Sequence, residues 1–159
     1  MLAPRLVGVV PAAVLPEPCR VLLAHDAHMT ATLERVHGAP VAVEVVRRRH
    51  DRAVYRREIL LSLPDGRNVQ YAVVDIALAH CPPSARDAIL AEQEPLGRIL
   101  QRLSTPLRVE PLAFVRALLP ARLAQRFVVA RGSPAYGRLV RIHHGPRCLI
   151  EGLELLAPA

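Results

Sequence analysis

Apolar and polar residues alternate along several short segments of the chain, and this pattern predicts a β-sheet built from hairpins. Residues 41–48 are rich in β-branched side chains. Residues 55–63 and 68–76 flank a Pro-Asp-Gly-Arg turn in which the glycine can take a positive φ. Residues 137–144 and 148–156 flank a second turn, Gly-Pro-Arg, and predict a second hairpin. Two shorter strands are expected at residues 6–10 and 126–130.

Helical periodicity appears between these strands. Gly38 fits the left-handed residue that ends a helix, and Ser84 with Asp87 predicts the N-cap of another helix. Because the strands occur in hairpins with helices between them, we expect an α+β fold, an antiparallel sheet of about six strands packed with helices. The helices are expected at residues 30–37, 85–93, 96–103 and 112–119.

The composition is typical of one globular domain covering residues 1–159, with residues 1–20 as a loosely structured lead-in. Hydrophobic residues make up 52% of the chain and aromatic residues only 3%, so the core must be aliphatic. All 21 basic residues are arginine, which excludes chemistry that needs a lysine, such as Schiff-base formation. With 14 acidic residues the net charge is +7, which favours an anionic ligand.

Several common partners and compartments find no support in the sequence. Pro4, Pro11 and Pro16 interrupt the apolar start, so we expect a cytoplasmic protein without a secretion signal or a membrane span. The basic run Arg47-Arg48-Arg49 has no interleaved aromatic residues, so we expect a solvated turn and no nucleic-acid partner. The oligomeric state stays open between monomer and dimer.

Motifs for common enzyme classes are missing from the sequence, including GxGxxG, Walker A, HExxH and GxSxG. The histidine clusters have no acidic or cysteine partner at ligand spacing, so we expect no metal site. Three charges inside apolar strands are more informative: Arg57, Glu151 and Glu154. Each lies either on the solvated face of an antiparallel sheet or in a pocket. The alternation of side chains places Glu151 and Glu154 on opposite faces.

Five blocks of the chain occur in an order and spacing that are informative together. They are Leu22-Leu23 through His28-Met29-Thr30 and Leu33; Arg57-Glu58-Ile59-Leu60-Leu61; Pro95-Leu96-Gly97-Arg98-Ile99-Leu100; Tyr136-Gly137-Arg138 with Arg141; and Glu154-Leu155-Leu156-Ala157-Pro158-Ala159. In register, they resemble the chorismate pyruvate-lyase (4-hydroxybenzoate synthase) family from about residue 22 to the C-terminus. The resemblance implies an antiparallel sheet flanked by helices.

The same resemblance implies a set of site residues. The family's ligand arginine falls on Arg57 and its ligand glutamate on Glu154, and both are expected to act in catalysis and in substrate binding. The backbone amides that hold a ligand carboxylate fall at Met29 and Leu96. Placing the glutamate at Glu154 requires a short insertion relative to the family, and Glu151 is the alternative.

Two positions bear on how well the family pattern fits. Gly152, next to the terminal glutamates, would leave room for a ring to approach. The family often has an arginine in the strand that here reads Gln70-Tyr71-Ala72, and this chain has none there.

The activity implied by the resemblance is a cofactor-independent carbon–oxygen lyase that converts chorismate into 4-hydroxybenzoate and pyruvate. A guanidinium at Arg57 suits a substrate carboxylate, and Glu154 could accept a hydrogen bond from the ring hydroxyl or shuttle the ring proton. Two alternatives are a domain of the same fold that binds an aromatic acid without chemistry, and a lyase that makes another hydroxybenzoate isomer. Such binding domains follow a winged-helix DNA-binding domain in transcription regulators, and only about 20 residues precede the first matching block here.

Overall fold

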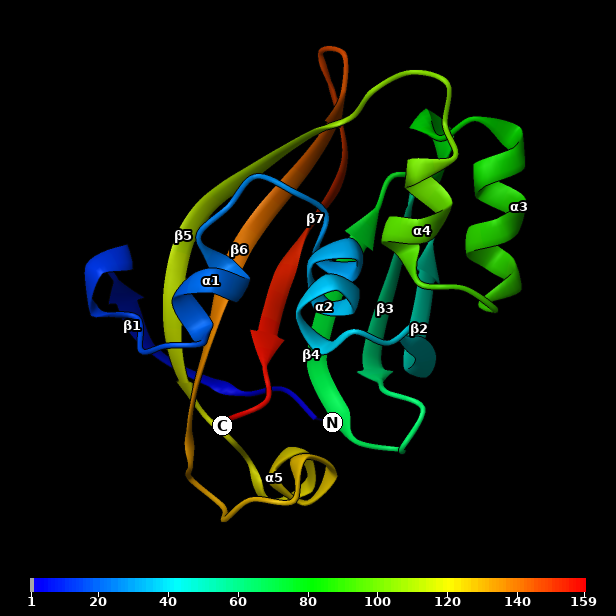
Figure 1. Ribbon diagram of the computed structural model, residues 1–159. Helices are drawn as coiled ribbons and strands as arrows, with labels where there is room; N and C mark the ends of the chain where they lie inside the picture. The colour runs from blue at the N-terminus through cyan, green and yellow to red at the C-terminus, as the bar shows by residue number, and fades with distance from the viewer. Residues whose placement is uncertain (1) are drawn as a thin grey trace.

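The computed structural model describes residues 2–159, which form a seven-stranded antiparallel sheet with helices packed on it (Figure 1). The strands lie in the order β1-β5-β6-β7-β4-β3-β2 across the sheet. Their bounds are β1 Arg5–Val10, β2 Ala42–Asp51, β3 Val54–Ser62, β4 Asn68–Ile76, β5 Arg108–Leu118, β6 Pro134–His144 and β7 Arg147–Leu156. The α-helices are α1 Cys19–Leu23, α2 Met29–His37, α3 Pro83–Ala91, α4 Leu96–Gln101 and α5 Ala121–Phe127, with 3-10 turns at Ala12–Val14 and Leu78–His80.

The centre of the sheet joins segments that are far apart in the sequence. Short turns connect β2 to β3, β3 to β4 and β6 to β7, and each of these pairs is antiparallel. Strand β7 then pairs with β4, so the C-terminal hairpin completes the sheet next to the first half of the chain. The register places Ile59, Ala72, Glu154 and Arg138 in one row across four neighbouring strands.

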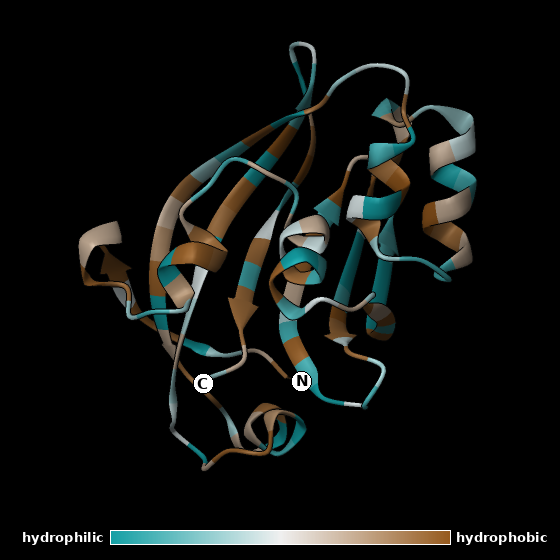
Figure 2. Ribbon diagram, viewed as in Figure 1, coloured by the Kyte–Doolittle hydropathy of each residue, from teal (hydrophilic) through white to brown (hydrophobic). Residues whose placement is uncertain are grey.

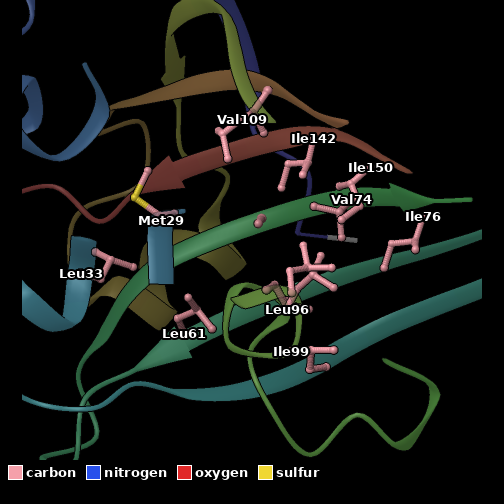
Figure 3. Packing of buried hydrophobic residues seen from close by; sticks show 14 of the residues in the cluster. Met29, Leu33, Leu61, Val74, Ile76, Leu96, Ile99, Val109, Ile142 and Ile150 are labelled. Carbon is pink, nitrogen blue, oxygen red and sulfur yellow. The ribbon is translucent and has the colours of Figure 1, made fainter. Parts of the chain in front are cut away.

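The two faces of the sheet are covered differently. Helices α1 to α4 contribute buried apolar side chains to the larger core on one face, whereas α5 packs against the other face (Figure 1). Apolar and polar residues alternate along much of the strands, as antiparallel strands with two different faces require (Figure 2). The larger core is aliphatic, as the composition predicted, and includes Met29, Leu33, Leu61, Val74, Ile76, Leu96, Ile99, Val109, Ile142 and Ile150 (Figure 3).

The fold class and the strongest local predictions are confirmed. The predicted helix at residues 30–37 is α2, and Gly38 ends it with a φ of 65°. The two predicted hairpins are β3–β4 and β6–β7. The sheet has seven strands where about six were expected.

Two predictions between residues 108 and 130 are wrong. Residues 112–119, expected as a helix, lie mostly in strand β5, because β1 and β6 supply hydrogen-bonding partners on both sides. Residues 126–130, expected as a strand, contain the end of α5, and Val128 follows it in the left-handed conformation. Neither the apolar run in β5 nor the Val128-Val129 pair after α5 discriminates by itself between helix and strand.

The short strand predicted at residues 6–10 is confirmed as β1, which pairs with β5 and extends the sheet. The loosely structured lead-in expected at residues 1–20 therefore contains a regular strand. The cap predicted at Ser84 is absent, because α3 begins at Pro83, two residues before the expected start, and Ser84 lies inside the helix. Pro82 precedes that helix without a side-chain cap hydrogen bond. Within residues 2–159, no helix is both long and apolar enough to cross a membrane.

Candidate functional site

A small enclosed cavity lies between the central strands and the first turns of α2 and α4. Its volume is about 40 Å³. The row of residues on β3, β4, β7 and β6 forms its floor, and His28 and the helix starts form its roof. The lining residues are His28, Met29, Thr30, Ile59, Leu61, Gln70, Ala72, Val74, Leu96, Gly97, Val109, Arg138, Val140, Ile142, Ile150 and Glu154.

The two helix starts converge because Gly97 has no side chain. A Cβ at Gly97 would lie 2.7 Å from Oγ1 of Thr30, so a larger residue would push α4 away from α2. Met29 and Leu96 are the first residues of their helices, and both line the cavity. The first N–H groups of a helix have no acceptor within the helix and are therefore available to an anion.

Glu154 lies at the cavity, and a buried arginine holds its carboxylate. Arg138 Nε donates to Oε2 of Glu154 at 2.6 Å. The same guanidinium donates from Nη1 to the carbonyl of His25 at 2.7 Å and from Nη2 to the carbonyl of Ala27 at 3.1 Å. Arg138 therefore connects strand β7 to the loop between α1 and α2.

Glu151 lies on the other face of β7. Arg141 donates to Oε1 of Glu151 at 2.9 Å, and both side chains are exposed to solvent. The alternation predicted for these two glutamates is thus confirmed, and Glu154 is the one that borders the cavity.

Arg57 is fully buried, and its guanidinium has no protein partner. Its Nε, Nη1 and Nη2 make no hydrogen bond to any residue that the structure describes. Burial lowers the pKa of Arg57, while the nearby Tyr55 and Glu92 act to raise it. A buried donor without an acceptor costs roughly 1–3 kcal/mol, and more when it is charged, so the guanidinium of Arg57 is costly to bury without a partner.

Arg57 does not itself line the cavity. Arg57 lies two residues before Ile59 on β3, so both side chains are on the same face of the sheet. Arg57 is paired in register with Val74. Both of these neighbours line the cavity. The structure thus brings Met29, Leu96 and Glu154 together and places Arg57 next to them.

The cavity is smaller than any aromatic ligand needs. A space of about 40 Å³ holds one or two water molecules, whereas pockets for drug-sized ligands measure about 300–1,000 Å³. A ligand that contacted both Arg57 and Glu154 would have to displace side chains such as Ile59 and Val74.

Larger hollows occur at the surface but lack this chemistry. One of them, of about 620 Å³, lies between the C-terminus, α1 and the end of α5. Its arginines are already paired, Arg126 with Glu44 and Arg67 with Asp65. None of the surface hollows described lies next to the buried, unpaired guanidinium of Arg57, whereas the small cavity is lined by its neighbours Ile59 and Val74 and by Glu154. The small cavity is therefore the candidate site.

Two histidines flank the Arg138–Glu154 pair. His25 places Nε2 at 2.7 Å from the carbonyl of Leu22, and its Nδ1 accepts from the amide of Ala27 at 3.1 Å. This arrangement is that of a neutral ring with its proton on Nε2. Burial lowers the pKa of His25, and the neighbouring Arg138 lowers it further. Burial also lowers the pKa of His28, which lines the cavity.

Near Arg57, but outside the cavity lining, a tyrosine and a glutamate are hydrogen-bonded to each other. The hydroxyl of Tyr55 donates to Glu92, and Arg48 donates to the same carboxylate at 2.8 Å. Burial and the hydrogen bond to Glu92 raise the pKa of Tyr55 to about 12. Glu92 therefore accepts from two donors, whereas the donors of the nearby Arg57 have no acceptor.

The sequence patterns did not single out Arg138 as a site residue. The signal was present, because Arg138 follows Gly137 in one of the five blocks and lies opposite Glu154 once the hairpin is in register. A Cβ at Gly137 would lie 2.3 Å from the carbonyl oxygen of Glu154, so this glycine permits the close approach of β6 to β7 beside the glutamate.

The expectation that Gly152 leaves room for a ring is wrong. A Cβ there would lie 2.5 Å from the carbonyl oxygen of Val73 and 2.8 Å from Cγ1 of Val74, so the neighbouring strand already fills the space. The segment of strand in which the family often has an arginine reads Gln70-Tyr71-Ala72 in this chain. Of these, Gln70 and Ala72 line the cavity and contribute no charge.

Comparison with known proteins shows the fold. No protein-family model and no curated protein matches the sequence. The effector domain of PhnF from Mycobacterium smegmatis superposes with a TM-score of 0.59 at 17% identity, over 82% of this chain and 88% of that domain. The C-terminal domain of a histidine utilization repressor from Pseudomonas syringae gives a TM-score of 0.55 at 16% identity, over 74% of this chain and 91% of that one.

The chain has the chorismate-lyase-like fold. Its structural neighbours include domains of regulators with that fold. Domains of this kind are the ones on which the non-catalytic alternative was based. A second structure of PhnF from Mycobacterium smegmatis matches with a TM-score of 0.58 at 17% identity, over 82% of this chain and 64% of that chain. These likenesses establish the architecture and leave the chemistry of the site to its residues.

Proposed function

We propose that this chain binds a small aromatic carboxylate on the helix-covered face of its sheet. The observation that carries the proposal is the buried guanidinium of Arg57, whose three nitrogens have no protein acceptor among residues 2–159. A carboxylate accepts two parallel hydrogen bonds from such a group, and burial strengthens them. The apolar side chains between Arg57 and Glu154 suit a ring, since the cavity lining is mostly aliphatic.

The ring would extend from Arg57 towards the opposite end of the cavity. There, Glu154 offers an acceptor to a ring hydroxyl, and the amides at Met29 and Leu96 offer donors to a second anionic group. Two anion sites separated by an aliphatic floor favour a dianion or a hydroxylated benzoate over a simple fatty acid. The fold of the regulator effector domains supports the binding part of this proposal.

A binding titration tests it. With 4-hydroxybenzoate as the probe, wild-type protein should bind, and Arg57→Ala should weaken binding by about 2–5 kcal/mol because a buried charge-assisted pair is lost. Arg47→Ala is the matched control, since Arg47 is exposed on β2 and should leave the affinity unchanged. Equal affinities for the two variants would refute the role of Arg57, and no binding by the wild type would refute the ligand class.

A second candidate is catalysis, the cleavage of chorismate to 4-hydroxybenzoate and pyruvate. The observation that favours it is the carboxylate of Glu154 at the cavity, in the block that resembles the lyase family. In this reaction the ring carbon that bears the hydroxyl loses its proton, and the neighbouring bond from ring carbon to ether oxygen breaks. The ring becomes aromatic, and the enolpyruvate leaving group takes up a proton to become pyruvate. No oxidant or reductant is consumed.

Incubation with chorismate in the presence of a chelator separates the two candidates. Formation of 4-hydroxybenzoate and pyruvate in equal amounts would support the lyase, and the 3-hydroxy isomer would support the fold with a different elimination. Binding of chorismate without turnover would leave the chain as a binding domain. Activity that requires an added metal would contradict an elimination driven by Arg57 and Glu154 alone.

A further inference from the structure

Two buried arginines serve the same face of the sheet, and they use their donors in opposite ways. Arg57 has no acceptor for any of its three nitrogens within the described residues. Arg138, equally buried, uses all three, on Glu154 and on the carbonyls of His25 and Ala27. Each nitrogen of Arg138 thus already has an acceptor in the protein, whereas no nitrogen of Arg57 has one, so the two side chains have different tasks.

We propose that Arg138 is a positioning residue that couples Glu154 to the loop of residues 24–28. The proposal rests on the proposed function for the identity of the ligand, whereas the coupling is a property of the free chain. The partners of Arg138 belong to two segments more than a hundred residues apart, β7 and the loop between α1 and α2. No hydrogen bond joins Glu154 directly to that loop within residues 2–159, so Arg138 is the connection between them.

The geometry of the guanidinium makes this connection stiff. Its donors form a planar fork with fixed directions, so the three acceptors cannot move independently. If Glu154 turns towards a ligand hydroxyl, Nε loses its acceptor, and the bonds to His25 and Ala27 must rearrange or weaken. The loop leads directly into Met29, the first residue of α2 and part of the cavity lining. A contact at Glu154 is thereby transmitted to the roof of the cavity.

Amide hydrogen exchange of residues 24–30 in the ligand-free protein tests the coupling. Glu154→Gln removes the charge and keeps the size of the side chain, and Arg138→Lys keeps the charge and removes the fork. Each single variant should exchange about tenfold faster or more in this segment. Arg138→Lys removes the fork that bonds the loop, and Glu154→Gln weakens the bond that fixes the orientation of Arg138. The double variant should exchange no faster than Arg138→Lys alone, since the effect of Glu154 passes through Arg138.

The matched controls come from the same two strands. Arg141→Lys and Glu151→Gln alter the exposed pair on the opposite face and should leave exchange of residues 24–30 unchanged. Exchange in Glu154→Gln that equals the wild-type rate would overturn the proposal. So would effects of the two single variants that multiply in the double variant. If Arg138→Lys does not fold, Glu154→Gln against Glu151→Gln decides the question alone.

The same experiment separates this proposal from the proposed function. If the wild-type chain does not bind 4-hydroxybenzoate but shows the exchange pattern, the coupling through Arg138 is supported and the proposed ligand is refuted. If the chain binds 4-hydroxybenzoate through Arg57 but does not show the exchange pattern, the proposed ligand is supported and the coupling is refuted. If both hold, adding 4-hydroxybenzoate should change the exchange of residues 24–30 in the wild type and leave it unchanged in Arg138→Lys.

Discussion

The hairpin of β6 and β7 carries two arginine–glutamate pairs that are alike in sequence and opposite in setting. Arg138 lies opposite Glu154, and Arg141 lies opposite Glu151, each arginine on β6 and each glutamate on β7. The side chains of the first pair are 1% and 13% exposed, and those of the second are 43% and 55% exposed. The register offset of three residues places the pairs on opposite faces, one under α1 and α2 and the other in solvent.

The surroundings, and not the residue types, decide what each of these ion pairs does. The exposed pair is solvated and screened, and such pairs contribute roughly 0–1 kcal/mol. The buried pair has lost its water and must be complete, because a single buried charge without its partner is strongly destabilising. The buried pair also borders the cavity and contacts the loop before α2, so it can take part in function.

The largest expected difference between the pairs is in turnover. If the chain cleaves chorismate, Glu154→Gln should lower the rate by about two to four orders of magnitude, the usual range for a group that transfers or holds a proton. Affinity should change less, because Arg57 would still hold a carboxylate. Steady-state kinetics with chorismate measure both quantities. Glu151→Gln is the control and should be near neutral, and the reverse pattern would move the functional acid to the solvent face.

The next difference is in stability. Arg138→Met should lower the free energy of unfolding by about 3–5 kcal/mol, because it leaves the carboxylate of Glu154 and two carbonyls without their donor. Arg141→Met should cost about 0–1 kcal/mol. Urea unfolding followed by circular dichroism measures both variants. Similar losses would show that burial does not distinguish the pairs.

Acid should act on the buried side of the hairpin. The pKa values of His25 and His28 are lowered in the folded chain from an ordinary value of 6.5, mainly by burial. Below pH 6.5 the unfolded chain therefore binds more protons than the folded one, and the free energy of unfolding falls as pH falls. Above pH 6.5 both states carry neutral rings, and this contribution to stability is fully present.

Unfolding titrations between about pH 7.5 and about pH 5.5 test this expectation. Each histidine can add at most about 1.4 kcal/mol per pH unit to the slope. The variant His25→Gln with His28→Gln should reduce the slope, and the exposed His37→Gln serves as the control. An unchanged slope in the double variant would assign the acid sensitivity to other groups.

The smallest expected effect concerns salt. The stability difference between the wild type and Arg141→Met should shrink when sodium chloride is raised from about 0.1 M to about 1 M, because the screening length falls from about 10 Å to about 3 Å. The difference caused by Arg138→Met should persist, since a buried pair is screened much less. Unfolding curves of the three proteins at both salt concentrations measure this. Equal salt dependence of the two variants would contradict the assigned exposures.

Much of the candidate site could be predicted from the sequence. Alternation alone separated Glu154 from Glu151, and the order of the five blocks selected Arg57, Met29 and Leu96. The environment of each residue could not be predicted in this way. Nothing local indicates that Arg57 lacks an acceptor while Arg138 has three, because the acceptors of Arg138 lie on another strand and on a distant loop.

The wrong predictions have the same cause. The apolar run in β5 fits either a helix or a strand, and only pairing with β1 and β6 on both sides makes it a strand. The strand expected at residues 6–10 is present as β1, but its place at the edge of the sheet could not be predicted, because its partner β5 is distant in the sequence. Gly152 was expected to provide space, whereas the adjacent strand fills it.

Local patterns in the chain were enough to establish the α+β class, the two hairpins, the aliphatic core and the faces on which the charged strand residues lie. These features depend on periodicity and turn chemistry, which act over a few residues. Only the folded arrangement determines which charged side chains are buried, which of them have hydrogen-bond partners and which have donors without an acceptor. Those properties depend on atoms brought together from distant parts of the chain, and burial changes the energy of a charge more than any local pattern does.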